Sequence, residues 1–123
     1  MNDRCTPAAA RRLKDQGFPQ PVPEPGQVWT KKDICVIIIR NLKGHTNVAF
    51  ENGTHVFRDN LEGACFCPTA PDILRELGYE YTLHHEDIYF CIYEPDGREL
   101  KIYENPNPAE ACAEAWEAKQ KQG

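Results

Sequence analysis

The chain has 123 residues, of which 41% are apolar and 27% charged, a composition that supports one hydrophobic core and argues against wholesale disorder. Its longest apolar run, Ile34–Ile39, covers six positions, far fewer than the roughly 20 that a membrane-spanning helix needs. The first residues lack the apolar core of a secretion signal. We therefore expect a cytoplasmic protein, without membrane contact, that folds as a single α+β domain over residues 1–123.

The net charge of −5 is distributed unevenly along the chain. Residues 1–60 hold nine Lys and Arg against six Asp and Glu, a balance of +3, whereas residues 61–123 hold five against thirteen, a balance of −8. Such asymmetry can determine which partner a protein binds, or favour head-to-tail association. Acidic residues most often simply keep the outer faces of helices and hairpins in contact with water. The balance does not favour binding to nucleic acid.

The N-terminal part predicts a helix followed by a proline-rich strap. Thr6 is a good N-cap, and Pro at the first helical position suits a helix over Pro7–Gln16. Proline then occupies every second position of Phe18–Gly26, which forbids helix and favours an extended path. We interpret residues 18–26 as a stiff strap across the surface, held by Phe18 and Val22; the alternative is a free ligand for an aromatic groove.

The apolar run Ile34–Ile39 predicts an interior strand with both faces buried, because it is short, β-branched and bounded by polar residues. A short strand over Gln27–Thr30 precedes it. We expect helices on one face of the run, and either the strap or a second copy of the protein on the other.

A β-hairpin should follow, because Asn52-Gly53 is the strongest two-residue turn signal. Its strands are Asn47–Glu51 and Thr54–Arg58, and the turn pairs Phe50 with His55, Val48 with Phe57 and Ala49 with Val56. Leu61–Cys67 is a candidate edge strand.

The second half begins with a helix whose start, Thr69–Asp72, resembles a capping box and whose end is Gly78. A strand over Tyr79–Leu83 comes next, and Ile88–Tyr93 and Arg98–Tyr103 form a second hairpin around Glu94–Gly97. The expected register sets Ile92 against Leu100 and Phe90 against Ile102 on a core face, and leaves Tyr89, Cys91 and Tyr93 on an aromatic, amphipathic face.

A last helix starts at Asn107-Pro108 and carries a buried stripe of Ala109, Cys112, Ala113 and Trp116. The elements thus follow the order α-ββββ-α-βββ-α. This order predicts an α+β fold with one antiparallel sheet of about six or seven short strands and three helices.

The standard catalytic and nucleotide-binding motifs are absent from the sequence, which lowers the case for an enzyme, and no cofactor is expected. The candidate metal ligands are Cys65, Cys67, His84 and His85, whose spacing does not match a zinc knuckle. The six cysteines are interpreted as reduced thiols rather than a disulfide framework.

Two other groups of residues are candidate binding sites. Arg40, His55 and Arg58 would form a basic pocket beside the first hairpin, suited to a phosphate-bearing ligand such as a nucleotide. Five tyrosines on an amphipathic sheet face would form a protein interface: Tyr79, Tyr81, Tyr89, Tyr93 and Tyr103.

Four segments together resemble small uncharacterised proteins of bacteriophages and prophages, especially of Bacteroidetes: Leu13–Pro21, Gly26–Trp29, Pro68–Leu74 and Pro108–Trp116. The resemblance spans most of the chain, and it rests on caps, turns and packing residues rather than on a catalytic motif. It implies a small cytoplasmic protein of the bacterial host cell that acts on a host or defence component.

The leading functional hypothesis is a non-enzymatic protein that binds a macromolecular partner as an oligomer. One alternative is a protein that sequesters a small ligand or nucleotide through Arg40, His55 and Arg58. Another is a metal- or thiol-dependent enzyme.

Overall fold

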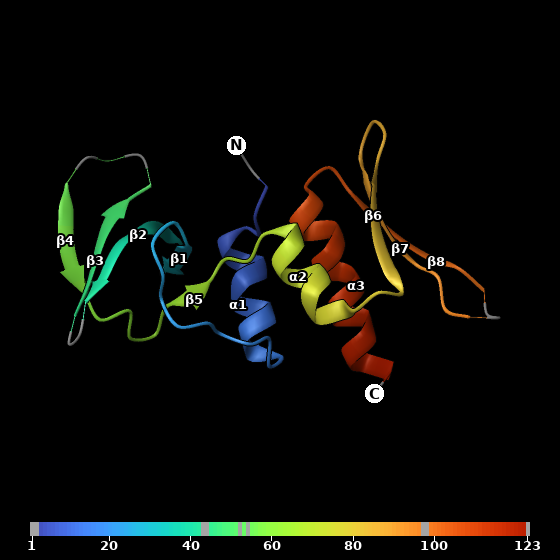
Figure 1. The fold of residues 1–123 in the computed structure, drawn as a ribbon, viewed down its shortest axis with the longest axis horizontal. Helices are drawn as coiled ribbons and strands as arrows, with labels where there is room; N and C mark the ends of the chain where they lie inside the picture. The colour runs from blue at the N-terminus through green and yellow to red at the C-terminus, as the bar shows by residue number, and fades with distance from the viewer. Residues whose placement is uncertain (1–2, 43–44, 52, 54, 97–98, 123) are drawn as a thin grey trace.

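The computed structural model describes residues 3–42, 45–51, 53, 55–96 and 99–122. Within these ranges the chain forms three helices and eight strands, in the order α-βββββ-α-βββ-α. The predicted α+β class is confirmed, but the strands form two antiparallel sheets of five and three strands instead of one. Figure 1 shows the sheets at opposite ends of the long axis, with the helices between them.

The first helix, α1 (Pro7–Asp15), begins where the sequence predicts, because the Thr6 hydroxyl accepts a hydrogen bond from the Ala9 amide at 3.3 Å. The proline segment is a strap, as interpreted. Phe18 is buried edge-on against Trp116, with 5.2 Å between the ring centroids. The prediction that Val22 also holds the strap is wrong, because 72% of the Val22 surface is exposed. Instead, the Gln20 side-chain oxygen accepts a hydrogen bond from the Phe66 amide at 2.9 Å.

The five-stranded sheet, called sheet 1, has the order β4-β3-β2-β1-β5. Its strands are β1 (Val28–Lys31), β2 (Ile34–Leu42), β3 (His45–Phe50), β4 (Val56–Asp59) and β5 (Cys65–Phe66). The predicted register of the first hairpin is confirmed, with Val48 opposite Phe57 and Ala49 opposite Val56. Asn52 of its predicted turn and Thr54 of its predicted second strand lie outside the described residues.

Strand β2 is an interior strand, as predicted, but the prediction that both its faces are buried is wrong. Val36 and Ile38 are buried on one face, whereas 45% of the surface of Ile39 is exposed. The reason is that α1 reaches only part of the other face, where Ala10 packs with Val28, Cys65 and Cys67. A register shift between Ile38 and Arg40 also interrupts the alternation of the strand.

Helix α2 (Ala70–Leu77) starts with a complete capping box. The Asp72 carboxylate accepts a hydrogen bond from the Thr69 amide at 2.9 Å, and the Thr69 hydroxyl accepts one from the Asp72 amide at 3.4 Å. Gly78 ends the helix with a φ of +101°, a conformation that favours glycine.

The three-stranded sheet, called sheet 2, consists of β6 (Tyr81–His85), β7 (Tyr89–Tyr93) and β8 (Lys101–Asn105), in that order. The predicted register of its second hairpin is wrong by two residues, because Ile92 lies opposite Ile102 and Phe90 opposite Glu104. The loop after β7 is therefore longer than the predicted turn. A shift of two keeps each residue on its predicted face, since side chains alternate with a period of two.

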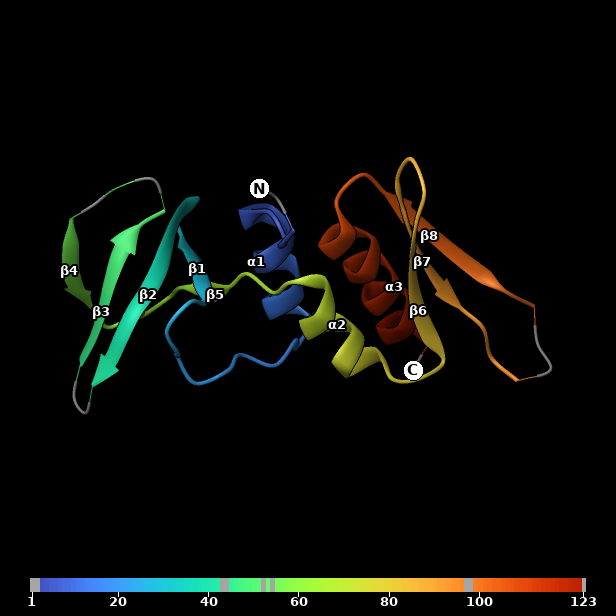
Figure 2. The same cartoon turned by 45° about the horizontal axis from the view of Figure 1, so that its top comes forward.

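Helix α3 (Pro108–Gln122) lies between α2 and sheet 2, and it also contacts α1 (Figure 2). Its small residues permit this close approach on several sides. Six of its side chains are buried: Ala109, Ala111, Cys112, Ala113, Ala115 and Trp116. Among the described helices, none combines the length and apolar character needed to cross a membrane.

The two faces of sheet 2 are the reverse of the prediction. The face with Tyr81, Cys91 and Tyr103 packs against the core around α3, and Cys91 is fully buried there. The face with Phe90, Ile92 and Ile102, predicted to be core, points away from the helices. Tyrosine suits the covered face because its ring packs on the alanine-rich helix while its hydroxyl reaches toward solvent at the edge.

Candidate functional site

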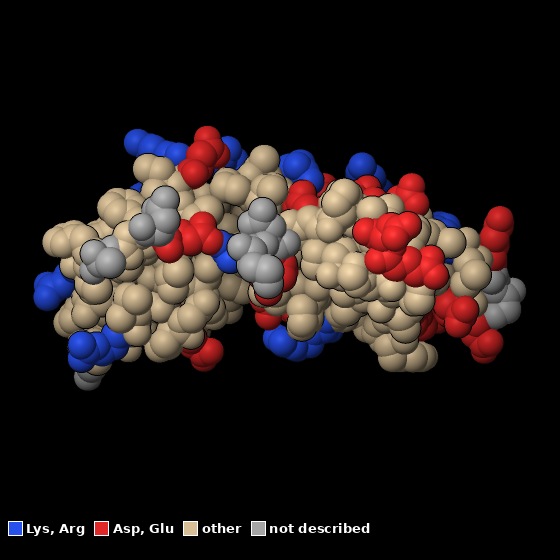
Figure 3. Space-filling view, turned by 90° about the horizontal axis from the view of Figure 1, so that it is seen from above, with Lys and Arg blue, Asp and Glu red and all other residues tan. Residues whose placement is uncertain are grey.

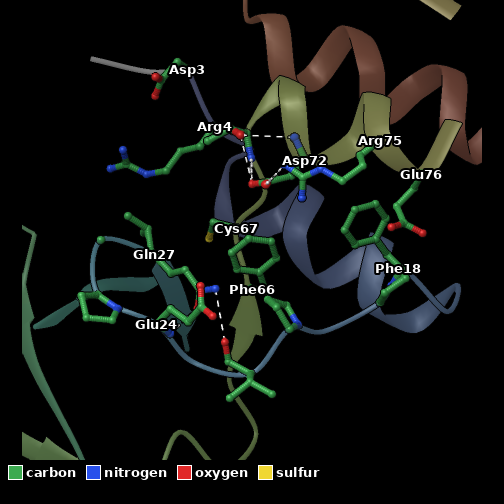
Figure 4. Close-up of a pocket in the computed structure, with 17 residues that line it drawn as sticks. Asp3, Arg4, Phe18, Glu24, Gln27, Phe66, Cys67, Asp72, Arg75 and Glu76 are labelled. Carbon is green, nitrogen blue, oxygen red and sulfur yellow. Dashed lines mark hydrogen bonds and ion pairs between the residues drawn. The ribbon is translucent and has the colours of Figure 1, made fainter. Parts of the chain in front are cut away.

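A concave feature lies beneath the proline strap (Figure 4). It has a volume of about 870 Å³, within the range of small-molecule sites. Phe66 and Cys67 of the β5 region form its centre, with Glu24 and Gln27 of the strap on one side and Asp72 of α2 on the other.

Several polar groups of this pocket are engaged in holding the fold. Asp72 completes the capping box of α2 and lies 3.6 Å from the Arg75 guanidinium. The Gln27 side-chain oxygen accepts hydrogen bonds from the Trp29 indole N–H and the Glu24 amide, both at 3.0 Å. Arg4 forms an ion pair with Glu51 of the first hairpin. These contacts assign the pocket a structural role, fastening the strap and the N-terminus to the domain.

The thiol of the pocket is not prepared for nucleophilic chemistry. Cys67 is buried, and this burial raises the pKa of its thiol to about 12. The thiol therefore stays protonated at neutral pH, whereas a reactive cysteine needs a lowered pKa. Burial likewise raises the pKa of Cys5 far above its ordinary value, with a further contribution from Glu110.

The predicted basic pocket is not assembled in the structure. Arg40 and Arg58 both lie opposite Asn47 on neighbouring strands, so they share one face of sheet 1. His55 instead stacks beside Phe57, which alternates with Arg58 and therefore belongs to the other face. The two arginines remain together as an exposed pair, and the histidine is separated from them by the sheet.

The candidate metal ligands fall in different parts of the molecule. Cys65 and Cys67 share a buried cluster with Ala10 at sheet 1, whereas His84 and His85 are exposed residues of β6 in sheet 2. The sheets lie at opposite ends of the molecule (Figure 1). Among the described residues, no group of three or more His, Cys, Asp or Glu is placed to hold a metal ion.

Four of the five predicted interface tyrosines face inward instead. Tyr81 is buried and stacks on Tyr93, with 4.5 Å between ring centroids, and Lys119 lies over the Tyr81 ring. Tyr89 and Tyr103 are half-buried against the core. Burial also raises the pKa of Tyr81 to about 12. Only Tyr79, among these five, projects fully into solvent.

An exposed, partly apolar surface lies on the opposite side of the same sheet. We call it the outer face, and it has two rows that run across the three strands: Thr82–Ile92–Ile102 and His84–Phe90–Glu104. More than half of the Ile102 side chain, 56%, is exposed, and Phe90 and Ile92 are only half-buried. Contiguous apolar side chains left open on a sheet mark a binding surface more often than isolated ones do.

A second pocket, of about 590 Å³, adjoins the outer face at the end where β7 leaves the sheet. Thr82 and Leu100 connect it to the apolar row, and its other walls carry three carboxylates, Glu80, Glu94 and Asp96. Residues 79–105 contain seven Asp and Glu against two Lys and Arg. On the face drawn in Figure 3, carboxylates gather at the sheet-2 end of the molecule. The outer face is therefore apolar at its centre and acidic at its margin.

Sequence reasoning identified the alternating residues of the outer face but placed them in the core. The tyrosines were the signal that could have identified the core face. Four large rings on one side of a sheet provide more apolar surface for packing against a helix than the side chains on the other side do. Comparisons with protein-family models, with curated proteins and with solved structures found no match to this chain.

Proposed function

We propose that the protein is a non-enzymatic binding protein that engages a macromolecular partner through the outer face of sheet 2. The observation that carries the proposal is the uncovered apolar pair Ile92 and Ile102, which lies beside an acidic pocket. Burying such side chains against a partner removes apolar area from water, at about 25 cal/mol per Å². The core of a protein interface has this composition, with charge confined to the rim.

The partner that fits this surface is a protein with an apolar patch bordered by Arg or Lys. Three carboxylates at the margin of the outer face would attract such a rim and repel an acidic one. In the phage setting that the sequence resemblance implies, this partner is a host or defence protein, and the bound form is an oligomer. Acidic margins also disfavour DNA and RNA, whose phosphates carry the same charge.

The two alternative functions receive less support. A nucleotide-sequestering site would need Arg40, His55 and Arg58 on one side of the sheet, and His55 lies on the other side. A thiol enzyme would need an accessible thiolate, and burial raises the pKa of Cys67.

The experiment is affinity purification from a bacterial lysate with three forms of the full chain: wild type, Ile102→Glu and Val22→Glu. The last is the matched control, because Val22 is exposed on the strap, away from sheet 2. A stoichiometric partner should be recovered with wild type and Val22→Glu and lost with Ile102→Glu, and the complex should form again from purified components. Equal recovery with all three forms, or recovery of no partner, would overturn the proposal.

A further inference from the structure

We infer that a second copy of this chain is itself a partner for the outer face, docking head-to-tail through the exposed arginine-bearing side of sheet 1. This inference rests on the proposed function, because it uses the same binding surface. It is carried by a second open surface at the other end of the molecule, whose chemistry complements the first.

This second surface, which we call the basic face, lies on strands β2, β3 and β4. Its residues form two rows across the strands, Ile37–Ala49–Val56 and Arg40–Asn47–Arg58. Both arginines are exposed, and so is 49% of the Val56 surface. Helix α1 covers this side of the sheet near β1 and β5, where Ile37 is partly buried, and Ala49 is buried as well. The open part of the two rows is therefore formed by Val56, Arg40 and Arg58.

The apolar rows of the two faces match in form. Each spans three antiparallel strands and places aliphatic side chains near its exposed end: Val56 on β4 of the basic face, Ile102 on β8 of the outer face. Two sheets pack face to face about 10 Å apart when such side chains interdigitate. Stacking one row on the other would bury the exposed aliphatic residues of both.

The charges beside the two apolar rows are opposite. On the basic face, the row next to the aliphatic one holds Arg40 and Arg58. On the outer face, the aliphatic row is bordered by the pocket with Glu80, Glu94 and Asp96. An arginine fork suits a carboxylate, because it donates two parallel hydrogen bonds to the two carboxylate oxygens. Head-to-tail docking therefore places guanidinium groups beside carboxylates.

Docking of like faces is less favourable. Two outer faces would bring two acidic margins together, and two basic faces would oppose four arginines, in both cases with repulsion between like charges. A head-to-tail contact is heterologous, so it leaves one free face on each end copy and produces either a ring or an open chain of molecules. A host partner on the outer face would compete with the second copy and shorten the assembly.

The test measures the mass of the full-length protein by sedimentation at increasing concentration. Wild type should form species larger than a dimer, and salt should weaken them, since the screening length falls from about 10 Å at 0.1 M to about 3 Å at 1 M. Arg40→Glu/Arg58→Glu blocks the basic face, and Ile102→Glu blocks the outer face. Each change should raise the dissociation constant roughly tenfold or more.

Two controls match these variants in charge. Lys32→Glu/Lys121→Glu makes the same charge change as the arginine variant at exposed positions in the β1–β2 turn and near the end of α3. Val22→Glu matches the Ile102 variant. Both controls should assemble as wild type does, and far-ultraviolet circular dichroism should show that all four variants are folded.

The decisive step is to mix the two blocked variants. Each alone should be monomeric, while an equimolar mixture should form a dimer and nothing larger, because only one intact pair of faces remains. A wild type that stays monomeric, or a dimer that resists the arginine changes, would overturn the inference. If wild type does not self-associate but Ile102→Glu abolishes binding of a partner from the lysate, only the inference is overturned. If the copies assemble but no partner is recovered, only the proposed function is overturned.

Discussion

Two neighbouring isoleucines of β2 should differ sharply in their contribution to stability. Ile38 is 1% exposed and Ile39 is 45% exposed, although the sequence places both within one apolar run. Replacing a fully buried isoleucine by alanine costs about 2–5 kcal/mol, because transfer free energy is lost and a cavity is left. The half-exposed residue should cost roughly 1 kcal/mol, about half of a buried side chain's transfer free energy.

Urea denaturation of Ile38→Ala and Ile39→Ala measures this difference directly. With a denaturant slope of about 2 kcal/mol per M for a chain of this size, the two midpoints should lie about 1 M apart. A second pair, Ile38→Thr and Ile39→Thr, keeps the β-branched shape and so controls for strand propensity. Equal losses at the two positions, or a larger loss at Ile39, would refute the one-sided burial of this strand.

Three further predictions concern the cap and the titrating groups. Thr69→Ala should lower the free energy of unfolding by about 1 kcal/mol in urea, because the capping box of α2 is broken. Tyr81 should titrate by ultraviolet absorbance near pH 12. Because folding favours its neutral form, stability should fall as the pH rises from 10 to 12, and less so in Tyr81→Phe. Of the six cysteines, only Cys35 is half-buried and the other five are buried. Ellman's reagent should therefore label one thiol rapidly in the folded protein. Rapid labelling that persists in Cys35→Ala, or that includes Cys67, would contradict this burial.

Much of the local structure could be predicted because it depends on short segments. Thr6, Thr69 and Gly78 mark helix ends through their own hydrogen bonds and backbone angles. The register of the first hairpin follows from its turn and from the alternation of Val48 and Ala49. Element order and the α+β class follow from these signals together.

The arrangement of faces could not be predicted in the same way, because it depends on which surface α3 covers. Alternation on β7 separates Cys91 from Ile92, but it does not say which of the two meets Cys112 of the helix. The register of the second hairpin depends on the length of its loop, and Gly97 and Arg98 of the predicted hairpin lie outside the described residues. Because the wrong face of sheet 2 was assigned to the core, the tyrosines that pack in the core were predicted to form an interface.

The candidate binding surfaces could likewise be predicted only in part from the sequence. The asymmetry between a basic first half and an acidic second half was visible from the sequence, and the structure places these halves largely at opposite ends. The structure also pairs Arg58 with Asn47 on one face of sheet 1. However, only the structure reveals that exposed aliphatic side chains accompany the charges at each end, since this depends on the part of sheet 1 that α1 leaves uncovered.

The central claim is that the outer face and the basic face bind each other, and methyl NMR on dilution tests it most directly. A sample labelled at the isoleucine methyl groups reports both surfaces, through Ile92 and Ile102 on one and Ile37 on the other, while the buried Ile38 and Ile73 serve as internal references. Signals from both faces should shift together as the protein is diluted, with the references unchanged. A concentration-dependent shift at one face alone, or at neither, would contradict the head-to-tail contact.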